Sequence, residues 1–177
     1  MQIEKNLPQF NEEKALLIVT GERSAKLYSA NQGFIEELAL FHIVNPVYSD
    51  REGSFGKSMG QTRIVSGAAY EMKQNLKLDL HTKFLHKLKQ DIDDVQKKNK
   101  FNVIFLFSPD FIAKDIYKNM TREVSDLIRL KVKGNFVEEH PFKLLQRIKK
   151  EYESLLGSKT PINEEAVKLL KPKKEIK

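Results

Sequence analysis

Apolar and polar positions in the first quarter of the chain follow a pattern of strands and turns. An apolar run at 15–20, closed by Gly21, is typical of a buried strand. Residues 24–29 are compatible with a second, short strand, and residues 34–44 with a longer third one. Between these two, Asn31-Gln32-Gly33 supplies turn chemistry, because Asn and Gly tolerate positive φ. Residues 15–44 therefore predict a three-stranded antiparallel meander.

The middle of the chain changes to the helical period. Apolar residues recur every three or four positions with lysines between them, which predicts one long helix from about 68 to 99. These apolar positions are Met72, Leu76, Leu80, Phe84, Leu88, Ile92 and Val95. Residues 101–107 are apolar on both faces, so they predict a central strand that is covered on both sides.

The last part of the chain predicts two short helices, a strand and a final helix. Ser108 followed by Pro109 is a helix-start signal, with the Ser as capping residue and the Pro in the first turn. Thr121 offers a cap for a second, short helix. Apolar and basic residues alternate over 127–133, as in a half-buried strand, and an amphipathic helix follows and ends at Gly157.

The resulting order of elements, βββ–loop–αβααβα, predicts one α/β domain over residues 1–157, with a mixed sheet between layers of helices. Residues 158–177 carry six Lys against three Glu and predict a basic, largely mobile tail.

Composition narrows the classes of protein to consider. The chain has 177 residues, the size of a single domain, and no cysteine. The lack of cysteine excludes a disulfide scaffold, thiol catalysis, a zinc finger and an iron–sulfur site, and it fits a reducing cytoplasm. No apolar stretch is long enough to span a membrane, and the polar N-terminus lacks the order of a signal peptide. We therefore expect a cytoplasmic protein without membrane contact.

The charge is unevenly distributed. Lys and Arg number 31 against 24 Asp and Glu, a formal net charge of +7, and the excess falls in residues 45–100 and 141–177. Such asymmetry favours an acidic partner, of which nucleic acid is the common one, while a solvated lysine-rich surface is the alternative.

Residues 45–67 break both periodicities and hold four of the eight glycines. An irregular segment of this length inside a compact domain is usually functional or disordered. Lys57-Ser58 follow a glycine, as in a nucleotide-binding loop, but such a loop needs another glycine at position 51. This chain has Arg51 there, which argues against a nucleotide-binding loop. Gly60-Gln61 remains as a candidate, because an amide both donates and accepts and a neighbouring Gly lets the backbone approach a ligand. An ordinary polar loop residue is the alternative interpretation of Gln61.

The four histidines predict no metal site and no His-dependent triad. His81 and His86 are five residues apart, whereas two ligands on one helix face are four apart. No cofactor is implied. Most phenylalanines lie at core periods, so the sequence does not imply a base-stacking role for them.

Three segments show a resemblance to a known family. They are residues 15–28, the strand 103–107 running into Ser108-Pro109-Asp110-Phe111, and the strand 128–134 leading to 141–145. With them, residues 15–153 resemble the middle domain of the archaeal and eukaryotic peptide-chain release factors and Pelota. The likeness is greater to the bacterial relatives of that domain, often labelled host-attachment proteins. The resemblance implies a ribonuclease H-like three-layer α/β sandwich with a mixed sheet.

The resemblance also implies a function. In release factors the loop before the long helix carries Gly-Gly-Gln, and this chain has Met59-Gly60-Gln61 there. The implied reaction is hydrolysis of the ester that joins a nascent peptide to tRNA. Gln61 would position water and stabilise the developing charge, and Gly60 would permit close approach. The lysines and arginine implied to contact rRNA or tRNA phosphates are Lys57, Arg63, Lys73 and Lys77.

Two departures from the family pattern leave the enzymatic role open. Met59 adds a side chain where release factors have a bare backbone, and no codon-reading or GTPase-partner domain is visible. A rescue role on stalled ribosomes requires no decoding. The alternatives are a non-catalytic module that binds ribosomes or RNA on the same scaffold, and a module whose basic tail recognises an acidic protein partner.

Overall fold

The computed structural model describes residues 1–44 and 67–157, with side chains from 76 to 154 in the second range. The elements in these ranges, in chain order, are β1 (Ala15–Thr20), β2 (Ser24–Asn31), β3 (Phe34–His42), α1 (Gly67–Asn99), β4 (Val103–Ser108), α2 (Asp110–Asn119), α3 (Arg122–Asp126), β5 (Ile128–Lys133) and α4 (Pro141–Gly157). The predicted tail at 158–177 lies outside the described residues, so the division into domain and tail stays a prediction.

The strands form one mixed sheet in the order β3-β2-β1-β4-β5. β1 and β3 each pair with β2 in antiparallel fashion, which confirms the predicted meander. β4 pairs with β1 and with β5 in parallel fashion. β1, β3, β4 and β5 therefore run in the same direction and end at the same edge of the sheet, which we call the carboxyl edge. The predicted ribonuclease H-like α/β sandwich with a mixed sheet is confirmed.

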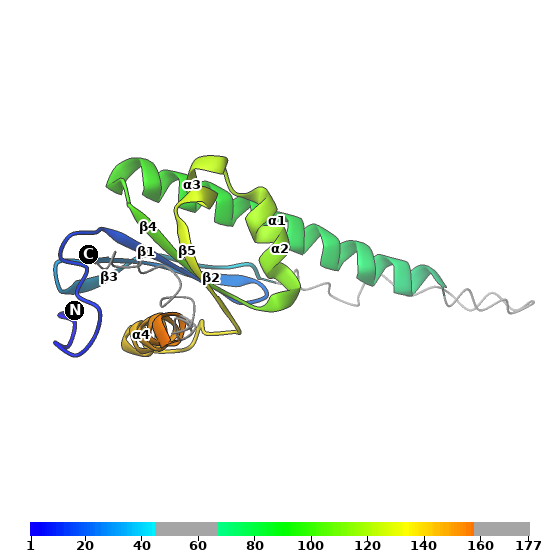
Figure 1. Cartoon of the computed structure of the whole chain (residues 1–177). Helices are drawn as coiled ribbons and strands as arrows, with labels where there is room; N and C mark the ends of the chain where they lie inside the picture. The colour runs from blue at the N-terminus through cyan, green and yellow to red at the C-terminus, as the bar shows by residue number, and fades with distance from the viewer. Residues whose placement is uncertain (45–66, 158–177) are drawn as a thin grey trace, which may run out of the picture.

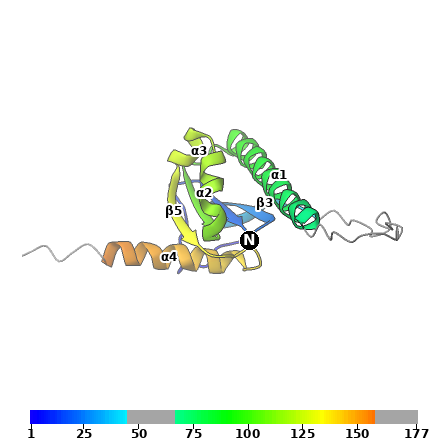
Figure 2. The ribbon, with the colours of Figure 1, turned by 90° about the vertical axis from the view of Figure 1, so that its right-hand side faces the viewer.

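Helices cover both faces of the sheet (Figures 1 and 2). Alternate residues of β1 point to opposite sides: Leu16 and Ile18 pack with Phe84 of α1, whereas Leu17 and Val19 pack with the residues of α4. α2 and α3 share the α1 side, and α4 lies on the other. Every residue of β1 and β4 is buried, as the uninterrupted apolar runs predict for strands covered on both faces.

The β2–β3 turn and β5 follow the sequence pattern closely. Gln32 and Gly33 have positive φ values of 48° and 77°, so the predicted turn is confirmed, although Gln32 rather than Asn31 adopts the left-handed conformation. In β5 the basic residues are exposed and the apolar ones are buried or half-buried, as the alternation predicts.

Both predicted helix caps need correction. Ser108 is the last residue of β4, and Pro109 occupies the N-cap of α2 without a side-chain capping bond. Ser108 stays in the sheet because it pairs with Lys133 and because its carbonyl accepts the Gly134 N–H at 3.0 Å. Thr121 does occupy the N-cap of α3, but its side chain makes no capping hydrogen bond.

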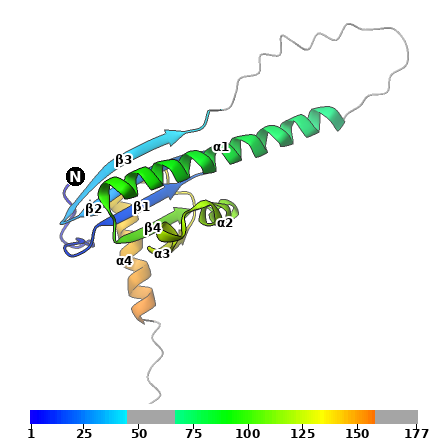
Figure 3. The same ribbon diagram turned by 90° about the horizontal axis from the view of Figure 1, so that it is seen from above.

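α1 is much longer than the strands it covers. Its 33 residues correspond to about 50 Å, whereas the six residues of β1 or β4 span about 20 Å. The end of α1 lies near the start of β1, where Lys14 Nζ donates to Asn99 Oδ1 at 3.2 Å. The excess length therefore projects past the carboxyl edge, as Figure 3 shows.

Candidate nucleic-acid interface

A cleft opens at the carboxyl edge between α1 and α2. Eight residues line its volume of about 260 Å³: Glu22 and Arg23 after β1, Lys77, Leu78 and His81 from α1, and Phe111, Ile112 and Asp115 from α2. We call it the carboxyl-edge cleft. Open α/β sheets commonly bind ligands beyond the carboxyl ends of their strands, so this is the region of the fold where a ligand is expected.

The packing of the two helices aims their polar side chains at each other. Phe84 anchors α1 on the sheet and is fully buried, and His81 lies three residues before it on the same side of the helix. Ile112 and Ile116 anchor α2 in the same way. Asp115 comes just before Ile116 and faces α1.

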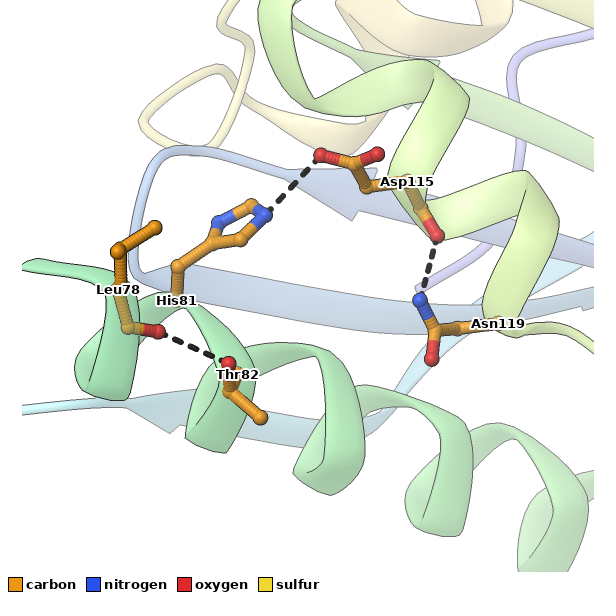
Figure 4. A network of polar contacts seen from close by, with 5 residues as sticks. All are labelled: Leu78, His81, Thr82, Asp115 and Asn119. Atoms are coloured by element: carbon orange, nitrogen blue, oxygen red, sulfur yellow. Dashed lines mark hydrogen bonds and ion pairs between the residues drawn. The ribbon is translucent and has the colours of Figure 1, made fainter.

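His81 and Asp115 form an ion pair or hydrogen bond across this cleft, which Figure 4 shows in detail. His81 Nε2 lies 3.2 Å from Asp115 Oδ2, and both side chains are partly exposed. The Asp115 carbonyl accepts a hydrogen bond from Asn119 Nδ2 at 2.8 Å. A carboxylate beside an imidazole fixes the orientation of the ring. The eight lining residues include no hydroxyl or thiol.

The charges that line the cleft balance when His81 is neutral: Arg23 and Lys77 stand against Glu22 and Asp115. Its carboxylates are engaged: Glu22 pairs with Arg23 at 3.4 Å and Asp115 with His81. Lys77 is exposed and forms no ion pair with a described residue.

Positive charge is in excess on the adjoining surface of α2 and β5. Asp110 pairs with Lys133 at 3.1 Å. Three further lysines are exposed and form no ion pair with any residue in the described ranges: Lys114, Lys118 and Lys131. The cleft and this surface together hold six cations and three carboxylates, a net charge of +3 with His81 neutral. The cations are Arg23, Lys77, Lys114, Lys118, Lys131 and Lys133, and the carboxylates are Glu22, Asp110 and Asp115.

Of the sequence-predicted site residues, only Lys77 has a side chain in the described part of the structure. Lys57, Gly60, Gln61 and Arg63 lie outside the described residues. Lys73 lies on α1, but its side chain is outside the described part of that helix. Lys77 lines the carboxyl-edge cleft.

Sequence reasoning missed the residues that line the cleft together with Lys77. Arg23, His81, Phe111 and Asp115 come from three separate segments, and His81 and Asp115 are 34 positions apart. One signal was available for Arg23: a turn that follows a buried strand must lie at an end of the sheet.

A second hollow, of about 580 Å³, lies between the middle of α1 and the end of α2 near Asn119. Lys89 and Lys97 line it together with Asp93 and Asp94, so its charges compensate one another. Over residues 1–44 and 67–157, no group of three or more His, Asp or Glu side chains is arranged to hold a metal ion.

The shifted pKa values lie on the α4 side of the sheet, where they reflect packing. Burial, with the nearby Glu37 and Glu138 carboxylates, raises the pKa of Tyr28 to about 12. A hydrogen bond from Arg129 lowers the pKa of Glu13, and one from Arg147 lowers the pKa of Glu139. Both pairs are bidentate guanidinium–carboxylate contacts that connect different segments of the chain.

Comparison with known proteins gives a distant structural likeness. The chain is similar to a crystal structure of an archaeal translation termination factor, with 7% identity, a TM-score of 0.43, and coverage of 81% of this chain and 41% of that one. It is also similar to a structure described as an archaeal protein, with 8% identity, a TM-score of 0.39, and coverage of 81% and 40%. The chain thus spans about two fifths of the length of these two structures.

No family model and no curated protein matches the sequence. Membership of the host-attachment family therefore stays a prediction. None of the helices in the described ranges is long and apolar enough to cross a membrane.

Proposed function

We propose that this protein acts in translation by associating with ribosomes or other RNA. The observation that carries the proposal is the surplus of positive charge at and beside the carboxyl edge. Glu22 and Asp110 each pair with a cation, Asp115 contacts His81, and the four lysines at 77, 114, 118 and 131 form no ion pair with a carboxylate of the described residues. Nucleic-acid phosphates are the usual complement of such a surface.

The arrangement of α1 supports this proposal. The helix places the exposed Lys77 in the carboxyl-edge cleft, and the rest of its N-terminal part projects beyond the sheet (Figure 3). Contacts of this kind position a protein on RNA without reading its sequence. Lys57, Arg63 and Lys73 are proposed to add to the same contact, on the strength of the family resemblance, and the protein is proposed to work in the cytoplasm.

A catalytic role for Gly60 and Gln61 is the more specific part of the proposal. By the resemblance to release factors, Gly60 and Gln61 are proposed to promote hydrolysis of the peptidyl-tRNA ester in the ribosome. The segment that carries them connects β3, which ends at the carboxyl edge, with α1, which begins beyond it. Gln61 would act mainly on the transition state, where an oriented donor is worth about 3 kcal/mol.

A non-catalytic binding module is the second candidate, and Met59 favours it. Met59 directly precedes Gly60 in the sequence, at the position where release factors have a glycine. Such a module would keep the basic surface and the binding of RNA, or of an acidic protein partner, without hydrolysis.

Two measurements test these proposals in turn. Purified protein is first pelleted with ribosomes at ~50 mM salt, where phosphate contacts are strongest. We expect the wild type to pellet and Lys77→Glu to pellet less. Lys150→Glu on α4, an exposed lysine on the opposite side of the sheet, is the matched control and should behave as the wild type. Wild-type protein that stays in the supernatant contradicts the proposed association.

Release of labelled peptide from ribosome-bound peptidyl-tRNA then separates the enzyme from the binding module. For an enzyme, Gln61→Ala should lower the rate by ~10²-fold or more while binding persists, because the amide acts on the transition state. Met59→Gly should hold or raise the rate. If both the wild type and Met59→Gly bind ribosomes but release no peptide, the catalytic proposal fails and the binding module remains.

A further inference from the structure

Two aromatic side chains of α2 are exposed instead of packing in the core. Phe111 is 67% exposed and Tyr117 is 42% exposed, whereas Ile112 and Ile116 anchor the same helix at 1%. The sequence pattern predicts phenylalanines at core periods, and Phe111 departs from it. Large apolar side chains gathered on a surface commonly mark a binding site.

Lysines lie between and beside these rings. Lys114 and Lys118 are one helical turn apart and form an exposed ridge along α2. On one flank of the ridge, Lys131 of β5 places its ammonium 3.9 Å from the centre of the Tyr117 ring. On the other flank, Phe111 lines the carboxyl-edge cleft with Lys77 and Leu78. We call Phe111, Lys114, Tyr117, Lys118 and Lys131 the α2 face.

We propose that the α2 face binds single-stranded RNA, with bases stacked on Phe111 and Tyr117 and phosphates on the lysines. Alternation of aromatic rings with cations is the pattern by which proteins hold single strands without reading their sequence. This inference rests on the proposed association with RNA and deepens it, because it names the strand type and a contact surface outside the segment that carries Gly60-Gln61.

The geometry favours a single strand over a duplex. Bases can stack on protein rings only when they are splayed out, and paired bases in a helix present no free face. Phe111 and Tyr117 are six positions apart, about 9 Å along the helix axis, and they lie on opposite flanks of the lysine ridge. A strand that crosses the ridge would place phosphates on Lys114 and Lys118 and bases on the two rings.

The Tyr117 ring is already oriented for stacking. The Lys131 ammonium lies over one face of the ring, an attraction that holds the ring in position. Tyr117 is nevertheless 42% exposed, so part of its surface is open to a base. The charges favour RNA over an acidic protein because an acidic segment would satisfy the lysines but would leave the two aromatic rings uncovered.

The test uses a fluorescent 12-nucleotide oligouridine and measures affinity by anisotropy over a salt series. Phe111→Ala and Tyr117→Ala should each weaken binding about tenfold, since stacking of one base is worth about that much, and should leave the salt dependence unchanged. Tyr117→Phe should bind as the wild type, because it keeps the ring. Lys114→Ala/Lys118→Ala should reduce the slope of log K against log salt by about 1.4, the value for two phosphate contacts on a single strand.

Matched controls lie elsewhere on the surface. Phe34→Ala removes a phenylalanine that is 60% exposed on β3, and Lys143→Ala/Lys150→Ala removes two exposed lysines of α4. Both should change the affinity less than threefold. A 12-base-pair duplex should bind at least tenfold more weakly than oligouridine, and poly-glutamate should not displace the oligouridine.

The outcomes separate this inference from the proposal beneath it. If the wild type binds neither oligouridine nor ribosomes, the association with RNA fails, and the inference with it. If the wild type binds both and the aromatic variants bind as tightly as the wild type, the α2 face is not the site. Equal binding of the duplex shows charge contacts without stacking, and effective competition by poly-glutamate shows a site for acidic protein. Either result overturns the inference.

Discussion

Gly134, just after β5 at the carboxyl edge, is the residue where one added methyl group should disturb the fold most clearly. Its φ is +140°, a conformation that L side chains rarely adopt. A Cβ built there would lie 2.5 Å from Phe136 Cζ. The Phe136 ring has little freedom to move, since it packs edge-on against Phe107 at 5.8 Å and Arg147 lies 4.4 Å from its centre.

The expected loss for Gly134→Ala has two parts. Backbone strain of this kind costs on the order of 1–3 kcal/mol, and overpacking against a fixed ring adds about 1–3 kcal/mol. We expect a free energy of unfolding lowered by about 3 kcal/mol. With a urea m-value of about 2 kcal/mol/M, the midpoint should fall by about 1.5 M.

Gly33→Ala is the matched control. Gly33 also has positive φ, at +77°, but the nearest obstacle is the movable end of the Gln9 side chain at 3.0 Å. This variant should lose only about 1 kcal/mol, the cost of the left-handed conformation. Urea unfolding followed by circular dichroism measures both variants. A loss for Gly134→Ala no larger than that for Gly33→Ala would refute the reasoning from the Phe136 contact.

Three further predictions concern the core and the ion pairs. Phe84→Ala should lower the free energy of unfolding by about 3–5 kcal/mol in the same urea assay, because this ring is fully buried beneath α1; a loss under 1 kcal/mol would contradict the packing. Arg147 lowers the pKa of Glu139, so the stability advantage of wild type over Glu139→Gln should be full above the ordinary glutamate pKa and should vanish as pH falls through the lowered one. A pH series of urea midpoints checks this, and an advantage that grows toward acid would be inconsistent with it. A double-mutant cycle with His81→Ala and Asp115→Ala should give a coupling under about 1 kcal/mol, because the pair is partly exposed; a much larger value would assign the pair a structural role.

The order and type of the elements could be predicted from the sequence because each carries a strong local pattern. The apolar runs at β1 and β4 and the long helical period of α1 leave little choice of structure. The parallel pairing of β4 with β1 agrees with the predicted mixed sheet, since helices flank β4 on either side in sequence. The predicted Ser108 cap is wrong because a local signal competed with the sheet: pairing with β5 holds Ser108 as a strand residue.

The surface that we assign to RNA could be predicted only in part. Lys77 was a candidate from the family resemblance, but its partners come together through the packing of α1 on α2, which no local pattern encodes. Phe111 and Tyr117 are adjacent to the buried Ile112 and Ile116 in sequence, so a helical projection of 110–119 would have placed them off the core face. The contact of Lys131 with Tyr117 depends on β5 lying beside α2 and needed the structure.

The most direct test of the central claim is the salt dependence of ribosome binding by the wild-type protein. Co-sedimentation is measured from ~50 to ~500 mM salt, and the fraction bound is converted to an apparent association constant. If lysine–phosphate contacts hold the protein on RNA, the logarithm of this constant should fall linearly with log salt, by about 0.7–0.9 for each contact. Four lysines at and beside the carboxyl edge, which form no ion pair with a described residue, then give a slope of about −3 or steeper. Binding that is absent at ~50 mM salt, or that does not change across the series, would contradict the association with RNA.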